Sequence, residues 1–225
     1  MQPRTGHHWV RDPKPGLVVA VTGIALAGFL LLTGAVLFFP AFHEVDARLS
    51  YAIRDELRVE ALDPFARGVT HIGSGVAMTV LTVIGSAVLL IAGRRAEALL
   101  LSATMIVGAA LMSLLKLLVE RPRPPIELAR VTMPETYAFP SGHTLAAFLF
   151  FGVVGFLVFI MARSPRAKLW GWLACALLAI GVAFSRVYLG VHYVGDVIAS
   201  WMLGSALITL AVAAYVGWVT RKPVE

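Results

Sequence analysis

Charged residues are scarce in this sequence: only 14% of its 225 residues are Asp, Glu, Lys or Arg, whereas 59% are hydrophobic. The mean hydropathy is +0.82. A water-soluble domain cannot hide so much apolar surface, because much of its exterior must face water. The composition therefore excludes an ordinary soluble protein and favours a chain that lies in a lipid bilayer.

Cysteine is almost absent as well. Cys175 is the single cysteine and lies in an apolar run, so no intramolecular disulfide can form. The sequence also lacks the short alternating segments that indicate a membrane β-barrel, and it shows no internal repeat or low-complexity segment. One helical domain over residues 1–225 is enough to explain the pattern.

Long apolar runs are what the sequence has instead. A helix needs roughly 20 apolar residues to cross a hydrocarbon core about 30 Å thick. Six runs reach or approach this length, at 16–39, 72–92, 96–119, 143–162, 169–189 and 193–219. The first is longer than the apolar core of a signal peptide, so we expect a retained anchor. The sequence predicts an all-α, integral membrane, six-helix transmembrane bundle.

Basic residues divide unevenly between the two sides of such a bundle. Six crossings place both termini on one side, which carries ten cations against three acids, a net charge of +7. The other side carries nine cations and ten acids. Because cytoplasmic loops are enriched in Lys and Arg, we expect both termini to be cytoplasmic. The pI of about 9.9 then reflects topology and does not indicate nucleic-acid binding.

The connector after the first run is more polar than the others. Apolar residues recur there at helical spacing among charged ones, at Phe42, Val45, Leu49, Ile53 and Leu57. This pattern predicts an amphipathic helix over about 41–63, which the Asp-Pro pair at 63–64 ends or restarts. The helix lies either flat at the extracytoplasmic membrane interface or packed on the bundle as a loop helix.

Three polar clusters interrupt the apolar pattern, and all three fall on the extracytoplasmic face. Charges beside a span cost about a few kcal/mol each, so they need partners or a function. In the first cluster, Lys116 is followed by Arg121 and Arg123. Lys116 and Arg123 could approach one anion. Alternatively, Lys116 extends to the interface and the arginines contact lipid headgroups.

The second cluster, Pro140 to His143, begins the fourth run. Ser141 suits a helix N-cap, and Gly142 allows a ligand to approach the backbone closely. The free N–H groups of a helix start form an anion site, and His143 stands in that first turn. As a plain helix start, however, the segment is ordinary, and His143 would be an interface residue.

The third cluster contains Ser185, Arg186, His192 and Asp196 across the turn between the last two runs. His192 and Asp196 are four residues apart and share a helix face. The carboxylate can accept a hydrogen bond from one imidazole nitrogen, which leaves the other as nucleophile or base. A capping pair is the alternative. No further cluster of metal ligands completes a shell, so we expect no metal and no cofactor.

Together the clusters supply three cations, two imidazoles and one orienting carboxylate. Three cations and helix N–H groups suit a tetrahedral phosphate, whose charge must be held during transfer. The motifs are Lys-x6-Arg-Pro at 116–124, Pro-Ser-Gly-His at 140–143 and Ser-Arg-x5-His-x3-Asp at 185–196. This arrangement resembles the type-2 phosphatidic acid phosphatase (PAP2) superfamily at every motif position.

The resemblance implies a role for each matched residue. His192 would attack phosphorus to form a phosphohistidine, Asp196 would orient His192, and His143 would protonate the leaving oxygen and later activate water. The phosphate oxygens would be held by Lys116, Arg123, Ser141, Gly142 and Arg186.

The short chain resembles the bacterial membrane lipid phosphatases of this family. The implied partners are the bilayer and a phosphorylated lipid of the undecaprenyl pyrophosphate, phosphatidylglycerol phosphate or phosphatidic acid type. A lipid-to-lipid phosphotransferase would use the same residues and stays open. A transporter is disfavoured, because its charges would lie near the membrane midplane.

Overall fold

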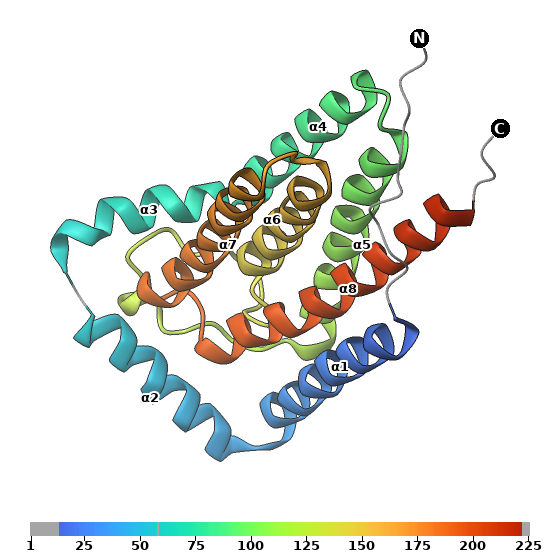
Figure 1. Cartoon of the computed structure of the whole chain (residues 1–225). Coiled ribbons are helices and arrows are strands. Elements are labelled where there is room, and N and C mark those ends of the chain that lie inside the picture. The colour runs from blue at the N-terminus through green and yellow to red at the C-terminus, as the bar shows by residue number, and fades with distance from the viewer. Residues whose placement is uncertain (1–13, 58, 222–225) are drawn as a thin grey trace, which may run out of the picture.

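The long apolar runs form long helices. The computed structural model describes residues 14–57 and 59–221. All secondary structure elements in this part of the chain are helices (Figure 1). The α-helices are α1 (Pro15–Phe38), α2 (Pro40–Glu56), α3 (Asp63–Ile72), α4 (Gly75–Ile91), α5 (Arg95–Val119), α6 (Gly142–Met161), α7 (Pro165–Tyr188) and α8 (Val194–Arg221). Two single-turn 3-10 helices, η1 (Glu60–Leu62) and η2 (Ile126–Leu128), complete the described elements.

Five helices are long and apolar enough to cross a membrane, namely α1, α5, α6, α7 and α8. The run expected at 72–92 is α4, whose 17 residues are short for a span on their own. The segment Glu60–Ile72 and α4 pass the same criterion as a pair that is bent by 52°. The all-α membrane fold is therefore confirmed, while the sixth crossing stays a prediction.

Helix α6 lies at the centre of the bundle. Half of its most apolar stretch is buried, compared with 11% for α1, whose apolar side chains face outwards. It packs against α5, α7 and α8, and α1 packs along α8. Aromatic and aliphatic side chains from four of these helices and the α5–α6 connector meet in one buried cluster that includes Phe29, Phe139, Leu145 and Leu203. This packing holds the start of α6 beside the start of α8.

The connectors gather at two ends of the bundle (Figure 1). The α4–α5 and α6–α7 turns share one end. The α1–α2 and α7–α8 turns share the other with the long α5–α6 connector. Arg94, Arg95 and Arg166 lie at the first end, as the charge pattern predicts. The terminal cations Arg4, Arg11 and Lys222 lie outside the described residues.

The amphipathic helix is shorter than expected. We predicted it over about 41–63, but α2 ends at Glu56. Val59 has extended backbone angles, φ −125° and ψ 116°, which a helix cannot accommodate. A new helix, α3, begins at Asp63 with Pro64 in its first turn, where the missing N–H of proline costs nothing. Arg58 lies outside the described residues.

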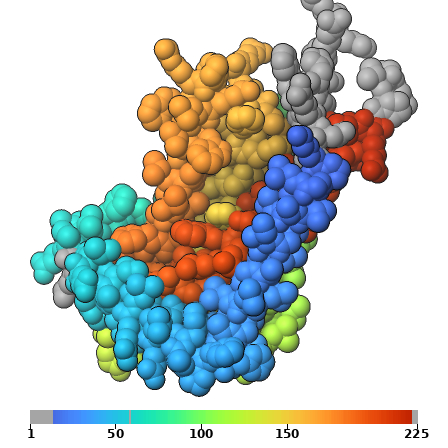
Figure 2. All heavy atoms as spheres, turned by 60° about the horizontal axis from the view of Figure 1, so that its bottom comes forward, coloured from blue at the N-terminus to red at the C-terminus, as the bar shows by residue number. Residues whose placement is uncertain are grey.

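The two faces of α2 have opposite surroundings. Asp46 and Ser50 are buried against the protein, although both are polar. Val45 and Leu49 are 63% and 48% exposed. Figure 2 shows α2 lying across one end of the bundle beside the start of α8, and the helix contacts both α7 and α8. The side of α2 that meets the bundle therefore carries Asp46 and Ser50 together with the partly buried Phe42 and Ile53, whereas Val45 and Leu49 face away from the bundle.

The bend between α3 and α4 has a steric origin. A Cβ atom on Gly73 would lie 2.4 Å from Cγ1 of Val182 in α7 and 3.4 Å from the carbonyl oxygen of His143. Only a glycine lets the chain pass this close to α7. The bend brings the last turn of α3 to the start of α6.

Candidate active site

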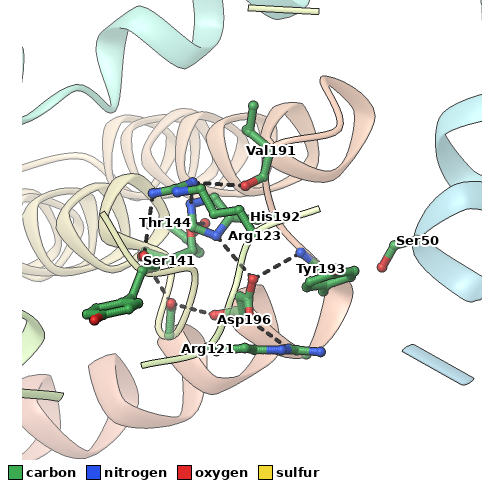
Figure 3. A network of polar contacts seen from close by, with 12 residues as sticks. Ser50, Arg121, Arg123, Ser141, Thr144, Val191, His192, Tyr193 and Asp196 are labelled. Atoms are coloured by element: carbon green, nitrogen blue, oxygen red, sulfur yellow. Dashed lines mark hydrogen bonds and ion pairs between the residues drawn. The ribbon is translucent and has the colours of Figure 1, made fainter. Parts of the chain in front are cut away.

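His192 and Asp196 form a buried pair at the start of α8. His192 lies in the α7–α8 connector, and its Nδ1 is 3.1 Å from Oδ2 of Asp196. The side chains are 1% and 0% exposed. Asp196 Oδ2 also accepts the backbone N–H of Tyr193 at 3.0 Å. The contact that the spacing predicted is present, with the carboxylate fixed from two directions (Figure 3).

A tight turn gives His192 this position. Gly190 has a φ of +71°, and a Cβ atom there would lie 2.4 Å from the carbonyl oxygen of Leu128. Glycine tolerates both conditions because it has no side chain. The chain therefore reverses within a few residues of the end of α7 and presents His192 at the start of α8.

The other ring nitrogen of His192 meets a cation. Its Nε2 is 3.2 Å from Nη1 of Arg123. A guanidinium can only donate hydrogen bonds, so Nε2 is the acceptor and the proton resides on Nδ1, facing Asp196. Burial, and then the charges of Arg186, Arg123 and Lys116, hold the pKa of His192 well below its usual range. The ring is thus neutral, with a lone pair on Nε2.

Backbone carbonyl groups orient two of the three predicted cations. Arg123 donates from Nε to the carbonyl oxygen of Thr136 at 2.6 Å and from Nη1 to that of Val191 at 2.9 Å. Lys116 donates to the carbonyl oxygen of Tyr137. Residues 136–137 therefore hold both cations next to His192.

Arg186 is oriented by a different element. Its Nη1 donates to the hydroxyl of Thr70 in α3 at 2.6 Å. Its Nε is buried and has no hydrogen-bond partner among the described residues.

The start of α6 completes the site. His143 lies in the first turn of α6, within electrostatic range of Arg186, His192 and Arg123. Ser141 occupies the N-cap position, as predicted, but its hydroxyl caps no backbone N–H. Instead it accepts a hydrogen bond from the Thr144 hydroxyl at 2.9 Å. A Cβ on Gly142 would touch only Met112, at 3.5 Å, so protein packing alone does not require glycine at this position.

The predicted residues thus gather from α5, α6, α7, α8 and the α5–α6 connector at one end of the bundle. Such an arrangement can hold a tetrahedral anion between cations, with an imidazole lone pair as a nucleophile.

Sequence reasoning missed two charged residues that join this cluster. Arg121, which we considered as a lipid headgroup contact, is 2% exposed and pairs with Asp196. Its other partner is Asp46 on α2. Nothing local to the chain distinguishes Asp46 from its acidic neighbours Glu44 and Asp55, because its partners lie at least 75 residues away.

Comparison with known proteins agrees with this site. The family model described as the PAP2 superfamily matches residues 97–219, more than half of the chain. The chain belongs to the PAP2 superfamily. The match covers all three motif clusters. His143, His192, Lys116, Arg123 and Arg186 all belong to these clusters.

Individual PAP2 proteins are similar to most of the chain or to part of it. Phosphatidylglycerophosphatase B of Bacillus subtilis is 30% identical over 83% of this chain and 91% of its own length. An undecaprenyl-diphosphatase of Sulfolobus acidocaldarius is 40% identical over 35% of this chain and 34% of its own. The crystal structure of a transmembrane PAP2-type phosphatidylglycerolphosphate phosphatase from Bacillus subtilis matches with a TM-score of 0.78 and 28% identity, covering 91% and 98% of the two chains. This PAP2 protein is a multi-pass membrane protein and a lipid phosphatase.

Proposed function

We propose that this PAP2 enzyme removes phosphate from a lipid phosphomonoester or pyrophosphate through a phosphohistidine at His192. The observation that carries the proposal is the orientation of the imidazole. Asp196 accepts a hydrogen bond from Nδ1–H, and the lone pair of Nε2 points towards Arg123, a natural ligand for a phosphate oxygen. A neutral, oriented imidazole among cations suits attack on phosphorus.

The proposed first step transfers the phosphoryl group to the enzyme. A substrate oxygen replaces Nε2 as the partner of Arg123, and Nε2 attacks phosphorus as the bond to the leaving oxygen breaks. Lys116, Arg123 and Arg186 hold the phosphate oxygens with Ser141 and the backbone of Gly142. Asp196 stabilises the cationic ring that forms.

His143 serves the leaving group and then the water. It protonates the leaving oxygen in the first step. In the second step it accepts a proton from a water molecule that attacks phosphorus, which releases phosphate and restores neutral His192. In this scheme His192 supplies the nucleophile and His143 gives up and regains one proton, so the reaction requires no metal ion.

We propose that the substrate is a lipid whose phosphate lies at the extracytoplasmic surface of the inner membrane, with both termini of the chain in the cytoplasm. Phosphatidylglycerol phosphate and undecaprenyl pyrophosphate are the first substrates to test, because similar proteins are named for activity on them. Phosphatidic acid is the third.

The test is phosphate release by the purified full-length protein in detergent with each of these lipids. The wild type should release orthophosphate in the presence of EDTA. His192→Ala should release none, whereas Lys116→Ala should retain residual turnover with a raised KM. Arg166→Ala is the control, because Arg166 lies in the first turn of α7, at the end of that helix opposite the motif residues Ser185 and Arg186. Turnover by His192→Ala, or loss of wild-type turnover in EDTA with recovery on adding a divalent ion, would refute the mechanism. A phosphorylated acceptor lipid in place of orthophosphate would make the enzyme a transferase.

A further inference from the structure

A buried chain of charges links the site to α2. Arg121 donates from Nη1 to Oδ1 of Asp196 at 2.7 Å and from Nη2 to Oδ2 of Asp46 at 2.8 Å. The three side chains are at most 4% exposed. Figure 3 shows Arg121 beside Asp196, on the side opposite His192. One guanidinium is therefore shared between two carboxylates, of which one contacts His192.

The same carboxylate of α2 holds the first turn of α8. Asp46 Oδ1 accepts the N–H of Gly195 at 2.9 Å, and the Ser50 hydroxyl accepts that of Val194 at 2.9 Å. A helix start leaves such N–H groups without partners, and here another helix supplies them. A Cβ atom on Gly195 would lie 2.6 Å from Oδ2 of Asp46, so glycine is needed for this approach.

Charge balance explains why two carboxylates face one arginine. A buried guanidinium needs a counter-charge, and a single carboxylate would be drawn into an exclusive pair with it. Asp46 takes one of the two N–H directions of Arg121. Oδ2 of Asp196 then stays directed at Nδ1 of His192, while Oδ1 receives Arg121.

We propose that Asp46 and Arg121 are positioning residues for His192, so that α2 is part of the catalytic apparatus. They act through Asp196 and do not touch the substrate. The proposal rests on the nucleophilic role of His192 described under Proposed function. It assigns a chemical task to a helix that carries none of the three motifs.

The effect on pH dependence follows from all charges near the pair. The charged and titratable groups that act on the pair directly are Lys116 from α5, Arg121 and Arg123 from the α5–α6 connector, His143 from α6, Arg186 from α7 and Tyr193. Asp46 from α2 acts on the pair through Arg121. Asp46→Asn removes one negative charge and leaves Arg121 to Asp196 alone. Both changes disfavour protonation of His192 and weaken its hydrogen bond to Asp196.

The experiment compares kcat, KM and the pH dependence of kcat/KM for full-length variants on whichever panel lipid the wild type hydrolyses. Asp46→Asn should lower kcat roughly tenfold, the order seen for outer-shell partners of oriented histidines, with little change in KM. Its acidic limb should move to lower pH. Ser50→Ala removes an uncharged cap from the same turn and should leave the acidic limb in place. Arg121→Lys should not retain wild-type activity, because an ammonium group lacks the forked N–H groups that contact two carboxylates at once.

A double variant separates coupling from general damage. Asp46→Asn combined with Arg121→Gln should lose less activity than the sum of the two single losses, because the part of the Asp46 effect that runs through Arg121 is already lost in Arg121→Gln. Additive losses, or a folded Asp46→Asn protein with wild-type kcat and acidic limb, would overturn the inference while leaving an inactive His192→Ala and the proposed function intact. If Asp46→Asn does not fold, Asp46→Glu keeps the charge but displaces the carboxylate, and it should show the same fall in kcat. A wild-type kcat for Asp46→Glu would equally overturn the inference.

Discussion

At the scale of single residues, His192 has partners of opposite charge on its two ring nitrogens. Asp196 accepts a hydrogen bond from Nδ1–H, while Arg123 donates a hydrogen bond to Nε2. The first contact makes the ring a better nucleophile, and the second keeps a proton off the attacking nitrogen. The lowered pKa of His192 is therefore part of the proposed mechanism, since attack requires the neutral form.

This arrangement predicts the acidic limb of the rate profile. Because its pKa is lowered, His192 stays neutral below the usual range of histidine, and activity that needs the neutral form is lost only as pH falls through the lowered pKa. In Arg123→Gln, one cation is removed, so protonation becomes easier and the acidic limb of kcat/KM should move to higher pH by about one unit or less. The measurement is kcat/KM against pH, which reports the free enzyme.

The comparison with wild type uses one substrate, so ionisation of the lipid phosphate cancels. Arg166→Gln is the matched control, because it removes an arginine at the opposite end of the bundle. An acidic limb in Arg123→Gln at or below the wild-type position would contradict the electrostatic role of Arg123.

How far the sequence could predict the site depends on the range of each contact. His192 and Asp196 are one helical turn apart, so their contact follows from spacing. Motif resemblance located Lys116, Arg123 and Arg186. In contrast, Asp46 meets Arg121 across 75 residues and Gly195 across 149. No local pattern encodes such pairs, because they form only when α2 docks on the bundle.

At the scale of elements, the apolar runs predicted five long helices well, because membrane spans have uniform composition over some 20 residues. The polar connector was harder. Its helical periodicity was visible, but the break at Val59 was not, and neither was the burial of the polar side chains of Asp46 and Ser50. Hydrophobic periodicity identifies a helix, whereas the side that packs depends on the partners it finds.

The α3–α4 bend provides a stability prediction. In Gly73→Ala, the new methyl group would overlap Val182, so the protein should lose about 1–3 kcal/mol of stability. Gly68→Ala is the control in the same helix. Nothing lies within 4 Å of a Cβ atom there, and alanine should stabilise α3 by up to about 1 kcal/mol. Thermal unfolding in detergent compares the two, and equal melting temperatures would contradict the close packing of α3 on α7.

The outward face of α2 provides a second prediction. Val45 and Leu49 are exposed, and we expect them to enter the membrane interface. Spin labels at Val45→Cys and Arg48→Cys, each with Cys175→Ser, should differ in proteoliposomes. The label at 45 should be more accessible to oxygen, and that at 48 to a water-soluble relaxing agent. Equal accessibility to the water-soluble agent would mean that α2 does not lie on the membrane.

At the scale of the whole molecule, the proposed site lies entirely at the end opposite the α4–α5 and α6–α7 turns (Figure 1). The charge distribution predicts that those turns are cytoplasmic. In that orientation a substrate phosphate would reach the site from the extracytoplasmic side, while its apolar chains stay in the adjacent leaflet.

Labelling can test this orientation. Cys175 is the single cysteine, so Cys175→Ser provides a clean background. A membrane-impermeant maleimide applied to intact spheroplasts should label Glu135→Cys, and it should label Ala167→Cys only after lysis. The reverse pattern would place the site in the cytoplasm.

The contacts between α2 and the start of α8 also constrain when activity can arise during synthesis. Asp46 and Ser50, which contact the start of α8, lie in the first quarter of the chain, whereas His192, the proposed nucleophile, lies in the last quarter. A ribosome-bound chain that has inserted α1 to α7 would contain Lys116, Arg123 and Arg186, but His192 would not yet be oriented by Asp196. Catalysis must await insertion of the final span, so a chain that stalls before that point remains harmless to the lipids around it.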